Sequence, residues 1–193
     1  MATSSGSERF TVRPYQKKDR ERLRKICLAT APKKVYEDEA FRERILLMYS
    51  DYYTAFESAH CFVAADEKDE AVGYVISAPS FRRYRFKFLP LLPRLFRLSH
   101  SAAKYWLFRL CEKQHAKEYP AHLHIDIFPA YHRLGLGTKM MDALMLHLKA
   151  IGVKGVMLGC GAKNLGGNAF YEAYGFTCLS RTADTVCWGM KLQ

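Results

Sequence analysis

Residues 125–138 read Ile-Asp-Ile-Phe-Pro-Ala-Tyr-His-Arg-Leu-Gly-Leu-Gly-Thr. An alternating apolar segment ends at Pro129, a short basic turn follows, and Gly135 and Gly137 then open an amphipathic helix. The first turn of a helix has unpaired N–H groups and a partial positive charge, and glycines let the backbone approach a phosphate closely. This stretch therefore predicts a strand, a turn and a helix N-terminus that together bind a phosphorylated cofactor.

Two common phosphate-binding motifs do not fit this stretch. A P-loop needs G-x-x-x-x-G-K-[ST], and no window of the chain supplies it. A dinucleotide fingerprint needs G-x-G-x-x-G, but Met140 stands at the position of the third glycine. No acidic residue ends a following strand at the required distance either, so the sequence excludes both classes of nucleotide site.

A second stretch, residues 155–176, reads Gly-Val-Met-Leu-Gly-Cys-Gly-Ala-Lys-Asn-Leu-Gly-Gly-Asn-Ala-Phe-Tyr-Glu-Ala-Tyr-Gly-Phe. It predicts an apolar strand and then a helix that begins at an asparagine N-cap. Together the two stretches resemble the GCN5-related N-acetyltransferases (GNAT). Their pyrophosphate turn is [RQ]-x-x-G-x-[GA] after a strand that ends in h-x-P, and their later block is N-x(6)-Y-x(3)-G-F. The residues at the spacings of the later block are Asn164, Tyr171, Gly175 and Phe176.

One position departs from the family pattern. The [RQ] position holds His132, with Arg133 beside it. This departure weakens or re-routes one contact, whereas the backbone cradle depends on the glycines. The residues that the resemblance assigns to cofactor binding are Ile125, Ile127, His132, Arg133, Leu134, Gly135, Leu136, Gly137, Thr138 and Asn164.

The resemblance covers most of the chain except about residues 80–119. Residues 10–14 are similar to the first strand of the family, and residues 61–64 and 72–76 are similar to its hairpin. The phrase from His122 to Asp126 is similar to a branch that includes the acetyltransferase-like domain of eukaryotic O-GlcNAc hydrolases and its stand-alone bacterial relatives. The implied fold is α/β, with a mixed, mostly antiparallel central sheet of about six or seven strands. We expect this sheet to splay at the cofactor site and to be flanked by helices.

Length and composition fit a single globular domain over residues 1–193, with an insertion at about 80–120. The chain is 49% hydrophobic and 13% aromatic, and it has no linker rich in proline, serine or glycine. No apolar run reaches about 18 residues, and Met1–Ser7 resembles no signal peptide, so we expect a cytoplasmic protein. The six cysteines show no zinc spacing, so we expect no metal and read them as buried or free thiols in a reducing compartment.

The net charge of +11 is concentrated in one segment. Residues 81–120 carry ten basic and two acidic side chains, and aromatic residues alternate with the cations in residues 81–97. Three interpretations remain open: the aromatics pack on the domain, the segment covers the acceptor or the cofactor phosphates, or it contacts a membrane or nucleic acid. We expect no nucleic-acid partner, because nothing resembles a nucleic-acid motif.

The resemblance implies acetyl transfer from acetyl-CoA to a primary amine by direct attack on the thioester. The pantetheine arm would enter between the strand of Ile125 and Ile127 and the strand at residues 156–160. Tyr171, by its place in the family motif, would protonate the departing thiolate. Its alternative role is that of a core aromatic whose hydroxyl binds a backbone carbonyl.

The base is a separate question. Asp126 lies between two inward apolar residues, so its side chain points to the opposite face of the strand, where burial would raise its pKa. It would then accept the amine proton directly or through water. The alternatives are that Asp126 is a structural carboxylate paired with His122 or His124, or that His124 is the base.

The acceptor is a small-molecule or protein amine that the sequence does not identify. The resemblance implies that the acceptor pocket is built from the variable segments of the family, which here are residues 33–58 and 80–119. In the first of them, Phe41, Ile45, Leu46 and Tyr49 predict a helix. A non-catalytic acetyl-CoA-binding module with the same fold is the alternative function, a basic nucleic-acid binder is a weaker one, and a homodimer remains open.

Overall fold

The computed structural model describes residues 9–108 and 110–192, and side chains 108–111 are outside this description. Within it, seven strands form one sheet in the order β1-β2-β3-β4-β5-β7-β6. Only β4 and β5 run parallel, and the other neighbouring pairs are antiparallel, as predicted. The strands are β1 Thr11–Pro14, β2 Cys61–Ala65, β3 Ala71–Ala78, β4 Ala121–Ile127, β5 Gly155–Gly161, β6 Thr177–Arg181 and β7 Thr185–Lys191.

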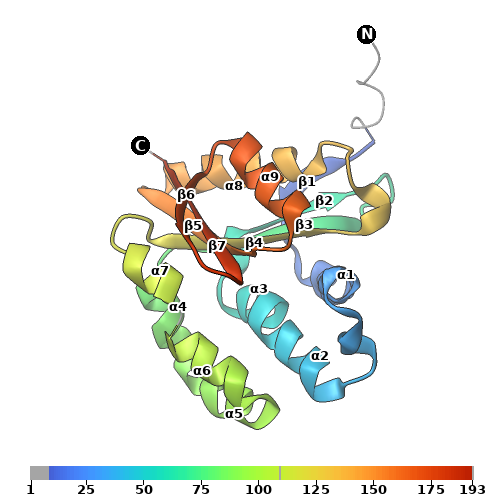
Figure 1. Cartoon of the computed structure of the whole chain (residues 1–193). Helices are drawn as coiled ribbons and strands as arrows, with labels where there is room; N and C mark the ends of the chain where they lie inside the picture. The colour runs from blue at the N-terminus through green and yellow to red at the C-terminus, as the bar shows by residue number, and fades with distance from the viewer. Residues whose placement is uncertain (1–8, 109, 193) are drawn as a thin grey trace.

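Helices cover both faces of the sheet (Figure 1). On one face lie α8 Leu136–Ala150 and α9 Leu165–Tyr174. On the other face lie α1 Arg20–Thr30, α2 Glu39–Leu46, α3 Tyr52–Phe56, α4 Phe81–Phe88, α5 Leu92–Leu98, α6 His100–Phe108 and α7 Leu110–His115. The short turns are η1 Lys17–Asp19, η2 Lys33–Tyr36, the π turn η3 Leu47–Asp51, η4 Ser58–His60, η5 Leu89–Leu91 and η6 Pro129–Tyr131.

The sheet separates two hydrophobic clusters. Because successive side chains of a strand point to opposite faces, β4 contributes to both. Leu123 packs with Met140 and Leu144 of α8, whereas His122 lies beside Tyr84 of α4 with ring centroids 4.5 Å apart. The polar side of β4 therefore faces the layer formed by α1 to α7.

The sheet opens between β4 and β5. Their pairing is limited to Ala121 with Val156 and His122 with Met157. On its other edge β4 remains paired with β3 as far as Ile127. The two parallel strands therefore separate from Leu123 onward, which confirms the predicted splay.

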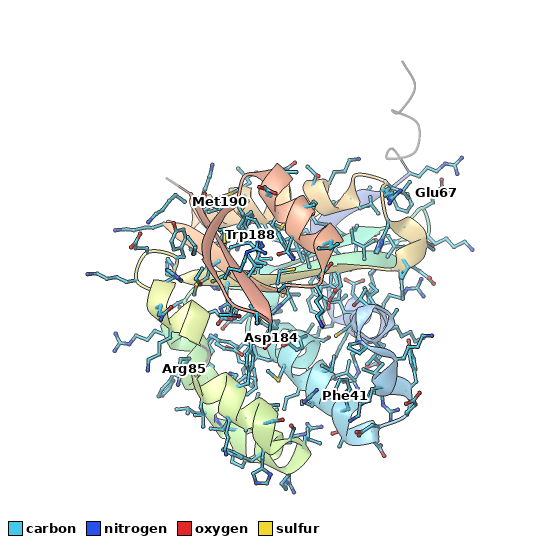
Figure 2. All side chains as sticks on the ribbon, in the orientation of Figure 1. Phe41, Glu67, Arg85, Asp184, Trp188 and Met190 are labelled. Atoms are coloured by element: carbon cyan, nitrogen blue, oxygen red, sulfur yellow. The ribbon has the colours of Figure 1, made fainter. Side chains whose placement is uncertain are left out.

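The insertion is helical, as predicted, and several of its aromatic residues are part of the core. Tyr84, Phe88 and Trp106 are fully or almost fully buried. The Tyr84 ring lies 4.8 Å from that of Tyr52 in α3, and the Phe88 ring lies 4.9 Å from that of Trp106. The guanidinium of Arg85, labelled in Figure 2, lies over the Trp106 ring. The first interpretation of this segment, aromatic packing on the domain, is what the structure shows.

The cysteines differ in part from expectation. Cys27, Cys61 and Cys160 are buried free thiols, and Cys178 is an exposed one. Cys187 is disulfide-bonded, so the expectation of free thiols is wrong there. Spacing along the chain does not show which thiols the fold brings within bonding distance.

Two further features concern the described ranges only. None of the helices placed there has both the length and the apolar character needed to cross a bilayer. Within the same ranges, no three His, Cys, Asp or Glu side chains are grouped so that they could hold a metal ion.

Two phenylalanines of α4 test whether the insertion belongs to the core. Phe88 is 0% exposed and Phe86 is 76% exposed. We expect Phe88→Ala to lower the free energy of unfolding by about 3–5 kcal/mol, because it leaves a cavity among aromatic rings. The matched change Phe86→Ala should alter it by no more than about 0.5 kcal/mol. Urea denaturation measures both, and equal effects would show that the insertion packs differently.

Candidate active site

A cavity of about 340 Å³ lies where β4 and β5 separate. Its wall includes both candidate catalytic residues, Asp126 from β4 and Tyr171 from α9. Asn164, Cys160 and Tyr49 also line it. The fold therefore brings together at one opening residues that are far apart in the sequence.

Asp126 is held by a neighbour on β3. The register places Tyr74 opposite Asp126, and the Tyr74 hydroxyl donates a hydrogen bond of 2.5 Å to Oδ2. Burial raises the pKa of the Asp126 carboxyl to about 6, although hydrogen bonds from Tyr74 and Thr30 act in the opposite direction. A half-buried carboxyl with this pKa loses its proton close to neutrality, so it is suited to accepting a proton there.

The two histidines on the same face of β4 have other neighbours. The His122 Nε2 lies 2.9 Å from the Tyr53 hydroxyl. The His124 ring packs edge-on against Tyr49, with centroids 4.9 Å apart, and also lines the cavity. On this face, Tyr74 donates a hydrogen bond to the Asp126 side chain.

Tyr171 is positioned by aromatic packing. Its side chain is 8% exposed, and its ring lies 5.5 Å from that of Phe170 and 5.8 Å from that of Phe176. Among the residues that the structure describes, none accepts a hydrogen bond from its hydroxyl, including any backbone carbonyl. Burial raises the pKa of this hydroxyl above the usual range of tyrosine, so the phenol keeps its proton at neutral pH.

The free edge of β4 presents backbone groups to the gap. The Phe128 N–H donates to the Val72 carbonyl of β3 at 3.0 Å. Because a trans peptide points its C=O away from its N–H, the Ile127 carbonyl faces β5 instead, and so do the groups of Ile125 two residues earlier. His132 Nε2 lies 2.9 Å from the Ile127 carbonyl. The histidine at the departure from the family pattern therefore supports the strand end.

The turn before α8 depends on unusual backbone angles. Arg133 has φ of +63° and Gly135, the N-cap of α8, has φ of +74°. No side chain caps the helix, so the first-turn N–H groups remain available. Leu136 is buried and Thr138 is exposed. Leu136 thus offers this site only its backbone, while the Leu134 side chain is partly buried beside the core cluster around α8.

The two positions of this turn, Gly135 and Gly137, require glycine for different structural reasons. A Cβ at Gly135 would have open space, so that glycine is explained by its positive φ. A Cβ at Gly137 would lie 3.2 Å from the Phe170 ring, so that glycine allows α8 and α9 to pack closely. The contact with Phe170 therefore gives Gly137 a packing role that the sequence did not predict.

Asn164 caps α9, as its place in the sequence predicted. Its side-chain oxygen accepts a hydrogen bond of 3.0 Å from the Gly167 N–H. The same residue lines the cavity, and its side chain lies close enough to Cys160 to lower the thiol pKa. Burial has the larger effect, so the pKa of Cys160 is raised overall and the thiol remains protonated at neutral pH.

Several residues of this site have no motif that would reveal them. Asp126 accepts hydrogen bonds from Tyr74 on β3 and from Thr30 at the end of α1. One wall of the cavity is formed by Ile45 of α2 and Tyr49 of η3. Their role arises from the register of β3 against β4 and from the packing of α1 and α2. Periodicity predicts those elements but not this contact.

The pKa of Asp126 offers a direct check of this geometry. Since the Tyr74 hydrogen bond stabilises the ionised carboxylate, Tyr74→Phe should raise the pKa of Asp126 further above about 6. The change Tyr36→Phe, at a tyrosine that is 66% exposed and outside the cavity, should leave it unchanged. Carboxyl carbon NMR titration measures the pKa, and an unchanged value in Tyr74→Phe would contradict the contact.

Comparisons with known proteins agree with this geometry. The chain matches the sequence profile of the acetyltransferase (GNAT) family over residues 21–176. The solved structure of SsHAT is 26% identical, covers 95% of this chain and 98% of that chain, and has a TM-score of 0.80. Ard1 from Thermoplasma volcanium is 16% identical, with coverage of 96% and 99% and a TM-score of 0.62. The putative acetyltransferase yncA from Salmonella typhimurium, solved with its cofactor acetyl-CoA, is 18% identical, with coverage of 95% and 94% and a TM-score of 0.56.

Proposed function

The chain belongs to the acetyltransferase (GNAT) family, and from that premise we propose that it transfers an acetyl group from acetyl-CoA to a primary amine. One observation carries the proposal: a half-buried carboxyl, whose pKa is raised to about 6, and a buried, protonated phenol line the same cavity between β4 and β5. Groups whose pKa values are shifted in this way are suited to the roles of base and acid in one reaction.

The site fits acetyl-CoA at two places. The amide-rich pantetheine arm pairs with the free edge of β4 at Ile125 and Ile127, in the manner of an added strand. The pyrophosphate binds the uncapped first turn of α8, at the N–H groups from Gly135 to Thr138. His132 and Arg133 lie on the turn that leads into this helix, so Arg133 adds a positive charge near the phosphates.

The chain's own residues supply the proton transfers. Asp126, as a carboxylate, takes a proton from the ammonium group of the acceptor, directly or through water. The neutral amine forms a bond to the thioester carbonyl carbon, the carbon–sulfur bond breaks, and the Tyr171 hydroxyl gives its proton to the thiolate. Because burial disfavours a thiolate as it disfavours a phenolate, this last transfer stays near balance despite the raised pKa of Tyr171. The nitrogen of the new amide gives up its excess proton, which restores the Tyr171 hydroxyl through water, and Asp126 releases its proton to solvent.

Direct attack is favoured over an acetylated cysteine intermediate. Cys160 and Cys27 both line the cavity, but burial raises the pKa of each thiol, that of Cys27 to about 12. A thiol that holds its proton is a weak nucleophile.

We propose further that the chain lies in the branch similar to the acetyltransferase-like domain of O-GlcNAc hydrolases. The phrase from His122 to Asp126 supports this proposal.

Tyr171→Phe tests the acid. The ring and its packing remain, but the dissociable proton is lost. We expect kcat for thiol release from acetyl-CoA, assayed on a panel of amines, to fall by roughly ten- to a thousandfold. The affinity for acetyl-CoA, measured by calorimetry, should hardly change, because only a transition-state interaction is removed. An acetyl thioester of a strongly acidic thiol should partly restore the rate.

A variant that runs at wild-type speed would contradict the role of Tyr171. If the wild type binds acetyl-CoA but releases no thiol with any amine, the chain is a binding module instead.

Two glycines with nearly the same backbone angle test the phosphate turn. Gly135 has φ of +74° and Gly152, at the other end of α8, has φ of +77°, and a Cβ would have open space at both. Asparagine tolerates this conformation. We expect Gly135→Asn to weaken acetyl-CoA binding at least tenfold, about 1.4 kcal/mol, because its side chain intrudes on the pyrophosphate. Gly152→Asn should bind acetyl-CoA with wild-type affinity. Equal affinities in the two variants would contradict the proposal that the pyrophosphate binds at this turn.

A further inference from the structure

A second cavity, of about 320 Å³, adjoins the first along one wall. Arg44, Ile45, Met48 and Tyr49 form one side of it, and α6 forms the other. Ile45 and Tyr49 also line the cavity that holds Asp126 and Tyr171. The end of α2 and the π turn η3 therefore form the wall that the two cavities share.

The local helix geometry explains this shared wall. Residues one, three and four positions apart form a continuous patch on a helix, and the four wall residues from α2 and η3 have this spacing. The helix widens into a π turn at Leu47–Asp51, a feature that is frequent at functional sites. A ligand that enters past α6 thus follows one surface from Arg44 to Tyr49.

Arg44 is a cation in the wall of the second cavity, and it has no carboxylate partner among the residues that the structure describes. Its guanidinium lies 4.2 Å from the centre of the Phe41 ring, which Figure 2 places on α2, and Nη1 donates a long hydrogen bond of 3.4 Å to the Ser99 hydroxyl. Among the described residues, no carboxylate lies within ion-pair distance of Arg44. By contrast, Arg42 contacts Glu39 at 3.6 Å and Arg94 contacts Glu43 at 2.7 Å.

A half-buried guanidinium without a carboxylate partner among the described residues favours an anionic ligand. Arg44 is only partly exposed, and its fork of five N–H donors matches the oxygens of a carboxylate or a phosphate. The surrounding field acts in the same direction, because residues 81–120 carry ten basic and two acidic side chains. Ligands with several positive charges are disfavoured beside this segment.

The charges of the two cavities are complementary to a particular kind of molecule. Asp126 is the one acidic residue among the described residues that line either cavity, and Arg44 is the one lysine or arginine. Between them lie the apolar and aromatic side chains of Ile45 and Tyr49. A carboxylate and a guanidinium with an apolar wall between them are complementary to an amine that has an anionic group at its far end.

We infer that the second cavity binds the acceptor, and that the acceptor is an amine that also bears a carboxylate or a phosphate. Its amino group lies beside Asp126, its chain lies along Ile45 and Tyr49, and its anionic group binds Arg44. This inference rests on the proposed acetyl transfer and adds the substrate class. It disfavours polyamines, aminoglycosides and lysine-rich protein segments as acceptors.

The test compares amines that differ only at the end remote from the amino group. For each chain length from 4-aminobutyrate to 8-aminooctanoate, the set contains the ω-amino carboxylate, the alkylamine, the diamine and the ω-aminoalkyl phosphate. With the wild type, at the best chain length, we expect kcat/KM for the carboxylate or the phosphate to exceed that for the alkylamine by about tenfold or more. The diamine should be the poorest, and the better of the two anions identifies the anionic group.

Variants at Arg44 assign the preference to this residue. Arg44→Gln should lower kcat/KM for the preferred anionic amine by about tenfold, mainly through KM, and should leave the alkylamine unchanged. Arg44→Glu should invert the order in favour of the diamine. The matched control is Arg42→Gln, on the same helix but outside both cavities, and it should change neither value.

A binding measurement separates this inference from the proposed function. If no amine yields thiol release, the proposed acetyl transfer has failed, but calorimetry with the ω-amino carboxylates and ω-aminoalkyl phosphates of the same set still decides the inference. Saturable binding that is lost in Arg44→Gln and kept in Arg42→Gln supports it. No binding to the wild type, equal binding to all three proteins, or a wild-type preference for 1,6-diaminohexane overturns it.

Discussion

The separation of β4 from β5 is the constraint on which the rest of the structure depends. The two strands pair at only two positions, while β4 remains bound to β3 along its other edge. Backbone N–H and C=O groups inside a protein need partners, so an edge that opens between two helical layers supports the proposal that a ligand with amide groups binds there. His132 contacts the Ile127 carbonyl, and this contact secures the end of β4 where the turn before α8 begins.

The same opening lets residues from both helical layers meet. Asp126 faces the layer of α1 and α2, whereas Tyr171 belongs to α9 on the opposite side of the sheet. Burial raises the pKa of both groups, but the consequences differ. It brings the carboxyl to about 6, where it still ionises at neutral pH, and it keeps the phenol protonated. The same physical effect thus leaves an ionised carboxyl and a protonated phenol in one cavity at neutral pH, which supports the proposed roles of base and acid.

Local signals in the sequence predicted much of this arrangement. The alternating run before Pro129, the glycine at Gly135 and the N-cap at Asn164 each depend on interactions within a few residues. The direction of the Asp126 side chain follows from strand alternation alone. These features were predictable because the chemistry that causes them lies within one strand, turn or helix end.

Contacts between distant segments were not predictable in the same way. Tyr74 meets Asp126 only because of the register of β3 against β4, and Gly137 is explained by Phe170 on another helix. The segment around Tyr49 was predicted as ordinary helix, yet it widens into the π turn that joins the two cavities. Periodicity predicts a helix and its buried face but not the partner that this face meets.

The pH dependence of kcat/KM is the most direct test of Asp126 as the base, because it reports the protonation of that carboxyl during turnover. The account predicts that the rate of the wild type falls below about pH 6, at the same pH for two amines of different basicity. In Asp126→Asn this acidic limb should be absent while acetyl-CoA still binds. A limb that persists unchanged in Asp126→Asn, or that moves with the pKa of the amine, would contradict the assignment of the base and the role of the cavity between β4 and β5.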